Sequence, residues 1–343
     1  MPATIHDVAA AAGVSPTTVS HALNNKGRVN AETRQRIVEA AKHLGYTANP
    51  LARGLVTGRS QTLAMQIAGF GRETFVPNSA YFTELLNAAC AAALECGYVS
   101  LLVPSSVEVL LERLEVDGAL IVDPTGEEEL IKLMETRQAP VVTTGRVPSL
   151  DPESSYWVDN DHVWAAERAL GHLDDRGYRR PALLTTASES YSIDAQRAYR
   201  RWMDARDGTA RIGEIRDDFT VEQAAMVAAR LLAETPRPDA IYATNDTSAL
   251  AALRAVRAAG LKAPEDVGIV AEMDTEALRV SDPPITAIDV YPARLGRSAV
   301  ALLVDLIEDR EPAAPHVVVE TDLVIRASTA GKADAPVAFG QTR

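Results

Sequence analysis

The chain has 343 residues, few cysteines, few aromatic residues and no long apolar run. Its only cysteines, Cys90 and Cys96, are too few for a disulfide framework or a four-ligand zinc site. Their spacing of six residues puts them on different sides of a helix, and we expect two small buried side chains that do not meet. No segment approaches the roughly 18 consecutive apolar residues of a transmembrane helix. The sequence therefore predicts a protein without membrane contact.

Targeting and catalytic signals are also missing. The first residues, MPATIHDVAAAAGVS, have no basic stretch followed by a long apolar one, so the predicted location is the cytoplasm. No G-x-S-x-G nucleophile motif occurs, and the glycine-rich loop at 69–74 lacks the third glycine of a dinucleotide-binding loop. Asp159 and Asp161, near His162 and His172, are predicted to be surface or helix-capping residues rather than metal ligands. We expect no enzyme activity, no metal and no cofactor.

What the chain does have is an uneven charge distribution. Apolar residues make up 47% and charged residues 24%, which is typical of a soluble globular protein, and the length suits about two domains plus a small module. The net charge is −13, yet residues 1–60 hold seven Lys and Arg against three acidic residues. A basic head followed by an acidic body predicts that only the head binds a polyanion such as DNA.

Three short helices are predicted in the head. Thr4 can cap the first helix and Gly13 ends it, while Ser15 is a good N-cap for a second helix that runs to about Asn24. A third helix is expected over residues 31–44. Two helices joined by a tight glycine turn, with a third behind them, form a helix-turn-helix.

The outward face of the second helix carries short hydrogen-bonding side chains and one histidine. Such side chains can read base edges in a DNA major groove. A helical bundle whose polar face is merely solvated is the alternative that this pattern alone leaves open. The residues concerned are Thr17, Thr18, Ser20, His21 and Asn24.

Nearly all of residues 4–60 resemble the DNA-binding head of the lactose-repressor (LacI/GalR) family. The resemblance rests on the motifs DVA, AGVS, TVS, ALN, LGY, NP, LAR and TGRS within one run. It implies base reading by Thr17, Thr18 and His21, and a hinge helix in residues 49–56, NPLARGLV, whose Leu55 wedges between the central base pairs of the operator. The full DNA-binding set that it implies is Thr4, Ser15, Thr17, Thr18, His21, Asn24, Arg28, Thr33, Tyr46, Asn49, Ala52 and Leu55.

Strand and helix patterns alternate from Thr62 onward, which predicts parallel sheets covered by helices on both faces. The fold class expected is therefore α/β, with a three-helix head and a body of two doubly wound lobes that resembles the family's periplasmic-binding-like sensor. The expected domains are 1–48 for the helix-turn-helix, 49–60 for hinge and linker, 61–157 plus 287–316 for one lobe, 158–286 plus 317–328 for the other, and 329–343 as a disordered tail.

Ligands of doubly wound folds bind at the carboxyl ends of the strands, here between the lobes. The resemblance places an effector among Tyr81, Phe82, Arg146, Tyr191, Phe219, Asn245, Asp246, Glu272, Met273 and Tyr291. The sequence departs from sugar-binding members at Ala195, Met273 and Gly145, where polar side chains are usual. These departures argue against a standard hexose or pentose, and favour a more apolar effector, a basic effector or loss of the effector.

The resemblance and the head together predict a homodimeric, sequence-specific transcription regulator that acts as a repressor. Its partners would be a pseudo-palindromic double-stranded DNA operator and a small-molecule effector bound between the lobes. The alternative from another class is a solute-binding protein of a transporter, which needs the body but has no use for the head.

Overall fold

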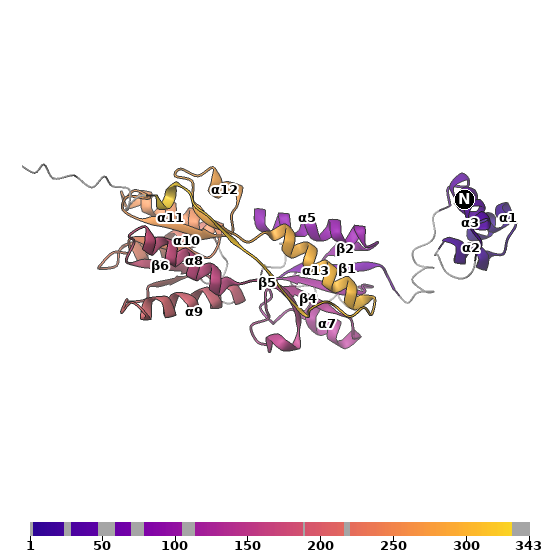
Figure 1. The fold of residues 1–343 in the computed structure, drawn as a ribbon, viewed down its shortest axis with the longest axis horizontal. Helices are drawn as coiled ribbons and strands as arrows, with labels where there is room; N and C mark the ends of the chain where they lie inside the picture. Colours follow the sequence, from indigo (N-terminus) through magenta and orange to yellow (C-terminus); the bar gives the residue numbers. More distant parts are fainter. Residues whose placement is uncertain are drawn as a thin grey trace, which may run out of the picture. The chain divides into compact units, whose positions relative to one another are not determined.

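The computed structural model describes residues 3–23, 29–46, 59–69, 79–104, 114–187, 189–215 and 220–330 (Figure 1). The chain divides into two compact units, Met1–Gln61, called the head below, and Thr62–Arg343, called the body. Within the described ranges, no helix is long and apolar enough to cross a membrane.

The head contains α1 (Ile5–Ala12), α2 (Pro16–Leu23) and α3 (Ala31–His43). The Thr4 hydroxyl accepts a hydrogen bond from the Asp7 backbone, and the Asp7 carboxylate accepts one from the Thr4 backbone, so both ends of the capping box are present. Gly13 takes a left-handed conformation with φ of 63°, which only glycine adopts without cost, and ends α1. Ser15 caps α2 through the Thr18 backbone. The predicted helix-turn-helix is confirmed.

A small apolar core holds the three helices of the head together. One fully buried side chain comes from each helix: Val8 from α1, Val19 from α2 and Ile37 from α3. Burying such a side chain contributes about 1.5–3 kcal/mol. The side chains on the opposite face of α2 contribute nothing to this core.

The first sheet of the body, sheet A, has six parallel strands in the order β11-β5-β4-β3-β1-β2. Alternate residues of its strands face opposite sides, so Leu63 and Met65 pack with α5 (Ala80–Glu95) and α13 (Pro292–Ile307), whereas Ala64 packs toward α7 (Glu129–Arg137). Figure 1 shows α5 and α13 side by side. The strands are β1 (Thr62–Ile67), β2 (Val99–Leu102), β3 (Gly118–Val122), β4 (Val141–Thr144), β5 (Tyr156–Asn160) and β11 (His316–Val319).

Sheet B has the order β12-β10-β9-β8-β6-β7, with all pairs parallel except the antiparallel pair of β10 and β12. One face is covered by α10 (Val221–Leu232) and α11 (Asp246–Ala258), the other by α8 (His162–Asp175) and α9 (Ser190–Asp204). The predicted doubly wound architecture is thus confirmed. The strands are β6 (Pro181–Thr185), β7 (Ile212–Glu214), β8 (Ala240–Ala243), β9 (Gly268–Glu272), β10 (Thr286–Asp289) and β12 (Asp322–Val324); short helices are η1 (Pro152–Ser154), α12 (Glu276–Arg279) and η2 (Ala327–Thr329).

The chain passes between the sheets three times, after β5, after β10 and after β11. The predicted lobe segments end at 157, 286 and 316, whereas the strands end at 160, 289 and 319. The crossings lie later because each strand pairs with one sheet along its whole length. The Asn160 amide ties the crossings together: it donates to the Val290 carbonyl at 3.2 Å and to the Val319 carbonyl at 2.9 Å.

Helix α9 begins at Ser190, and its polar first turns bury Ser192 and Asp194 on the inner side. One local prediction, that both cysteines are buried, is wrong. Cys96 is exposed rather than buried, since it follows the last turn of α5, whereas Cys90 is partly buried and contacts the Met65 sulfur at 3.9 Å.

Candidate functional site

Two exposed side chains on the outward face of α2 can form hydrogen bonds to DNA. Thr17 and His21 are exposed, and among the described residues neither side chain has a hydrogen-bond partner. Thr18 is half-buried, and its hydroxyl lies 2.8 Å from the Ser15 hydroxyl within the cap. Thr17 and His21 lie one helical turn apart, so both can reach into a groove at the same time.

The other predicted DNA contacts have structural roles or lie outside the described residues. Thr4 caps α1, and the Thr33 backbone donates to the Asn30 side chain, which caps α3. Tyr46 packs against the core of the head. Asn24, Arg28, Asn49, Ala52 and Leu55 lie outside the described residues.

A second group of polar side chains gathers where strands of both sheets end, and we call it the interlobe cluster. Its core is His162 at the start of α8, between Asp159 of β5 in sheet A and Glu272 of β9 in sheet B. The His162 ring contacts the Asp159 carboxylate through Nε2 at 3.0 Å and the Glu272 carboxylate through Nδ1 at 2.5 Å. All three side chains are buried. The histidine therefore joins carboxylates of the two sheets.

The electrostatics of this triad favour a charged histidine. Burial opposes its charge, but Asp159 and Glu272 together raise the pKa of His162 well above its usual value. Although burial alone raises the pKa of Asp159, His162 and Arg146 hold it below the usual value. The Tyr242 hydroxyl donates to the second oxygen of Glu272 at 2.5 Å. Both ring nitrogens thus act as donors, and every carboxylate of the triad is satisfied.

Arg146 forms a second link between the lobes. It follows β4 of sheet A and donates through Nε to Asp159 at 3.1 Å. Its Nη2 pairs with Asp194 on α9, which packs on sheet B. The guanidinium thereby pairs with one carboxylate from a strand of sheet A and one from a helix that packs on sheet B.

A narrow pocket opens beside this network. Its free volume is about 10 Å³, about the least that holds one water molecule. Asp123, directly after β3, has a left-handed backbone with φ of 50°. Burial first, and then Glu189 and Asp159, raise the pKa of Asp123 to about 8. The lining residues are Tyr81, Asp123, Thr144, Gly145, Asp159, Asn160, His162, Ser190, Tyr191, Met273, Val290 and Leu295.

The structure brings only part of the predicted effector set together. Tyr81, Tyr191 and Met273 line the pocket, and Arg146 and Glu272 belong to the network beside it.

Four other predicted effector residues make local contacts instead, and one lies outside the described residues. Phe82 packs edge-to-face on Tyr81, with ring centroids 5.1 Å apart. Asn245 caps α11, and Asp246 accepts a hydrogen bond from the Thr247 backbone at 2.7 Å. Tyr291 donates to Asp322 at 2.6 Å. Phe219 is not described.

Sequence reasoning included Glu272 but missed Asp123, Asp159, His162 and Asp194 as members of the cluster. Asp161 does cap α8, as predicted, by accepting from the Trp164 backbone at 2.9 Å. Asp159, in contrast, is buried and ion-paired, so its prediction as a surface or capping residue is wrong. The available signal was position: Asp123 and Asp159 each end a predominantly apolar strand segment, where ligands of parallel sheets bind.

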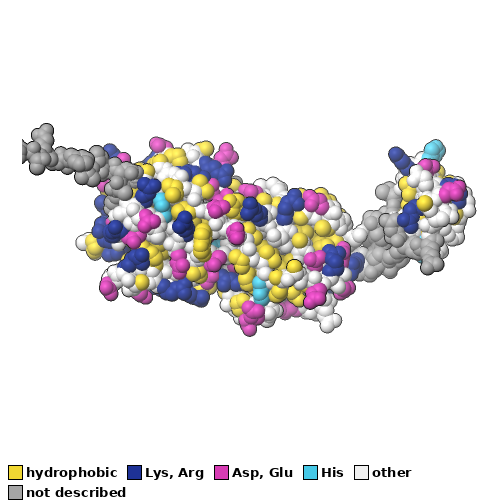
Figure 2. Space-filling model, in the orientation of Figure 1, with side chains coloured by type: hydrophobic (Ala, Val, Ile, Leu, Met, Phe, Trp, Pro, Cys, Tyr) yellow, Lys and Arg dark blue, Asp and Glu magenta, His cyan; other side chains and the backbone are white. Residues whose placement is uncertain are grey.

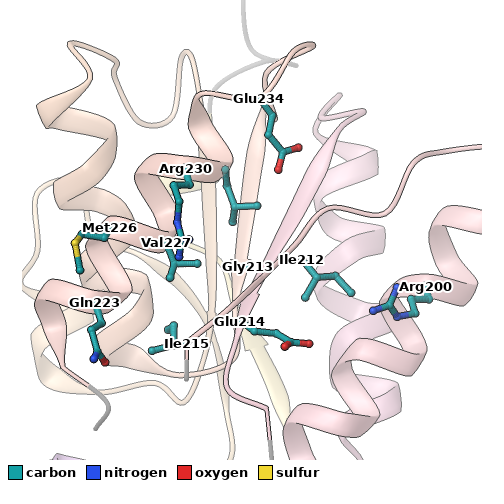
Figure 3. A pocket seen from close by; sticks show the side chains of 11 residues that line it. Arg200, Ile212, Gly213, Glu214, Ile215, Gln223, Met226, Val227, Arg230 and Glu234 are labelled. Atoms are coloured by element: carbon teal, nitrogen blue, oxygen red, sulfur yellow. The ribbon is translucent and has the colours of Figure 1, made fainter. Parts of the chain in front are cut away.

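A larger hollow lies elsewhere, at the β7 edge of sheet B, with a volume of about 720 Å³. Figure 3 shows Arg200 on α9 and Arg230 on α10 on opposite sides of β7. Its wall is largely apolar, and its charged groups do not converge on one point. The interlobe cluster therefore has the stronger chemistry for a specific ligand.

Comparisons with known proteins find matches for both the head and the body. Residues 4–49 match the model described as "Bacterial regulatory proteins, lacI family", and residues 170–329 match that of a "Periplasmic binding protein-like domain". A relative named HTH-type transcriptional regulator CelR, from Thermobifida fusca, is 29% identical over 95% of this chain and 98% of its own length. The HTH-type transcriptional repressor PurR of Mannheimia succiniciproducens is 29% identical with the same coverage.

Solved structures extend this similarity to the whole fold. A structure titled as a complex of the transcriptional regulator CelR with cellobiose has a TM-score of 0.71 and 27% identity, and covers 95% of this chain and 99% of that one. A lac repressor dimer bound to operator and the anti-inducer ONPF has a TM-score of 0.77 at 22% identity, covering 96% and 99%, and shows the same fold. The head, the two-sheet body and these similarities lead to one conclusion: the chain carries the DNA-binding head of the lacI family of bacterial regulatory proteins and is a transcription regulator.

Proposed function

We propose that this chain is a repressor that binds a pseudo-palindromic operator as a homodimer and responds to a small molecule bound between its lobes. The observation that carries the proposal is the exposed face of α2, on which Thr17 and His21 lie one turn apart. In a dimer, two such helices read two half-sites in successive major grooves. The protein would act in the cytoplasm, where bacterial DNA lies.

The charge distribution supports DNA binding through the head alone. The head carries a net positive charge, whereas residues beyond 60 carry a net negative charge. On the face of the body shown in Figure 2, acidic and basic side chains are interspersed. Phosphate contacts by head arginines and lysines would make the affinity fall steeply as salt is raised.

An edge of sheet A supports the homodimer. β2 is the outermost strand of that sheet, and a solvent-exposed apolar edge is a template for association. The exposed fractions of Leu94, Val99, Leu101 and Leu102 are 67%, 60%, 40% and 38%. We propose that a second copy covers these side chains.

Regulation would come from movement of the two lobes. We propose that they comprise residues 61–160 with 290–319, and 161–289 with 320–328, and that the effector changes their relative position. Residues 49–60 would then transmit the change to the head as hinge and linker. Coupling of this kind typically amounts to about 1–3 kcal/mol. Thr329, where the predicted tail begins, is instead buried in η2 and hydrogen-bonded to His172 and Thr286.

The proposed hinge role has its own test. Leu55 is proposed to wedge into the minor groove at the operator centre, as apolar side chains of architectural proteins do. Leu55→Ala should weaken operator binding far more than binding to unrelated DNA. Equal losses on both DNAs would contradict the wedge role and leave the base-reading role of α2 standing.

The function is tested by selecting bound sequences from a random DNA library with the purified full-length protein. We expect a two-fold symmetric site, and we expect the Thr17→Ala and His21→Ala variants to change the recovered half-site. Recovery of no enriched sequence, with and without added metabolite pools, would overturn the proposal.

A further inference from the structure

We propose that the interlobe cluster binds an effector that carries a protonated amine or guanidinium group, held by the Asp123 carboxylate and the Thr144 hydroxyl. The inference rests on the effector-controlled function proposed above and specifies the ligand's chemical class. It starts from the excess of carboxylates around the pocket and from two polar groups there that have no partner.

Acidic groups outnumber basic ones in the cluster. Among the described residues its cations are Arg146 and His162, each of which lies between two carboxylates, and the exposed Arg197, which lies 3.6 Å from the Asp194 carboxylate. None of these three cations forms an ion pair with Asp123. The carboxyl groups are those of Asp123, Asp159, Glu189, Asp194 and Glu272.

Two polar groups at the pocket lack partners. The Thr144 hydroxyl is buried, with 1% of the side chain exposed, and has no hydrogen bond. Within the described part of the chain, the Asp123 carboxylate accepts no hydrogen bond either. Both residues line the same pocket. An unmet buried hydroxyl costs free energy, and an ammonium group offers three donors that can satisfy both oxygens at once.

The electrostatics of Asp123 point to the same ligand. The positive charge of His162 on α8 favours the ionised form of Asp123. Glu189, before α9, and Asp159, on β5, repel its negative charge. Tyr81 on α5 and Tyr191 on α9 also face this region, and burial raises the pKa of both well above the usual value, so they stay neutral. Burial and repulsion raise the pKa of Asp123 to about 8. A bound cation would lower this pKa again, so binding near neutral pH would release a proton from Asp123.

The backbone at Asp123 and the closed pocket suit a site that is completed by a ligand. Asp123 has a φ of 50°, and strained conformations of this kind are common at binding sites. The free volume of about 10 Å³ admits no organic ligand until the lobes separate. The Arg146–Asp194 pair joins the lobes, and a ligand cation would compete with Arg146 for the same carboxylates.

A neutral sugar fits the cluster less well. Ala195, where the resemblance expects a sugar-binding arginine, is fully buried in the core beneath α9 and offers no polar group. Met273 presents a thioether to the pocket where a carboxylate is usual. The polar groups that remain at the pocket mainly accept hydrogen bonds, which suits a ligand that carries several donors.

The test uses the full-length protein and two matched pairs of probes, 1-amino-1-deoxysorbitol against sorbitol, and putrescine against 1,4-butanediol. Isothermal titration calorimetry is run from pH 6 to pH 8.5 in two buffers with different ionisation enthalpies. We expect an amine to bind at least tenfold more tightly than its alcohol partner, with affinity rising toward pH 8 and a fraction of one proton released at pH 7.

Three variants sharpen the test. Asp123→Asn keeps the shape and tolerates a left-handed backbone, so it should fold, yet it should abolish both the amine preference and the proton release. Thr144→Val should lower the affinity several-fold. Asp282→Asn is the matched control, because the Asp282 side chain is 98% exposed on a loop of sheet B. This control should change neither the amine preference nor the proton release.

Three results would overturn the inference: equal or tighter binding of the alcohols, amine binding that survives Asp123→Asn, or no binding by any of the four probes. Retention of each preparation on the selected operator DNA is measured in parallel. Normal operator binding combined with any of these results would reject the cationic ligand alone, whereas loss of operator binding in the unmodified protein would reject the proposed function.

Discussion

The head and the interlobe cluster build their functional surfaces in opposite ways. In the head, Thr17 and His21 lie four residues apart on one eight-residue helix, are exposed, and take no part in the core. In the cluster, Asp123, Asp159 and Glu272 come from strands far apart in the chain. The head can therefore change its DNA specificity without losing its fold, whereas a change in the cluster affects ligand binding and stability together.

The sharpest test of the separation between the two regions is removal of residues 1–61. The body forms its own compact unit with two complete sheets, so the shortened chain should keep its fold. Operator binding should be lost completely, because the body carries net negative charge. Retention on operator DNA over a salt gradient measures this, with thermal unfolding as the control. Operator binding by the shortened chain would contradict the assignment of DNA binding to the head alone.

The next largest effect is expected inside the cluster. Glu272→Ala leaves His162 and Tyr242 without their shared partner, and breaking a buried ion pair in this way costs about 3–5 kcal/mol of the free energy of unfolding. Chemical denaturation of the body measures it. Glu276→Ala on exposed α12 is the matched control and should stay within about 0.5 kcal/mol. Equal small changes in both variants would mean that the network does not stabilise the body.

Close packing of α5 on α13 gives a prediction for the body alone. A methyl group at Gly296 would overlap the Leu85 carbonyl oxygen and lie 3.1 Å from the Ala89 nitrogen. Gly296→Ala should lower the free energy of unfolding by about 2 kcal/mol. Gly171 on α8 faces open space, so Gly171→Ala should instead raise it by about 1 kcal/mol through helix propensity. Thermal unfolding of both variants checks the opposite signs.

The pH dependence of stability distinguishes the cluster from the head. Burial, Glu189 and Asp159 raise the pKa of Asp123 from 3.8 to about 8, so between these values the folded protein binds more protons than the unfolded chain. Stability contributed by this proton is present at low pH and is lost as the pH rises toward 8. His162 adds a loss in the same direction above about pH 6.5, because its raised pKa also favours the protonated folded state.

Asp123→Asn removes the first of these two losses. Relative to the unmodified protein, the variant should gain up to about 4 kcal/mol in free energy of unfolding between pH 5 and pH 9. Urea denaturation at the two pH values measures the difference. Identical pH profiles for variant and unmodified protein would show that Asp123 is not protonated in the folded state.

The smallest effect is expected on α2. His21→Ala removes an exposed side chain, so the stability of the head should not change, while operator affinity should fall by about 1–2 kcal/mol with little change on unrelated DNA. Exposed His43 on α3 offers the control His43→Ala, which should leave operator affinity unchanged. Competition binding with the selected operator reports both values. A loss of stability in His21→Ala would contradict the independence of the reading face from the core.

The success of sequence reasoning follows the range of the interactions. Helix caps at Thr4 and Ser15 and the turn at Gly13 depend on neighbours within a few residues, and these predictions are confirmed. The short strands β7 and β12, with three residues each, carry no periodic pattern long enough to identify them. Their places depend on the partner strands β6 and β10.

The sequence by itself determined the local elements of this protein: the three helices of the head, the exposed face of α2, and the alternation of strands and helices that requires doubly wound sheets. Each depends on spacing or on a cap within one turn. Only the tertiary structure decided that His162 lies between Asp159 and Glu272, that Arg146 reaches Asp194, and which carboxyl group is left without a partner. The physical reason is that charge and desolvation act through space, between groups that the chain order keeps far apart.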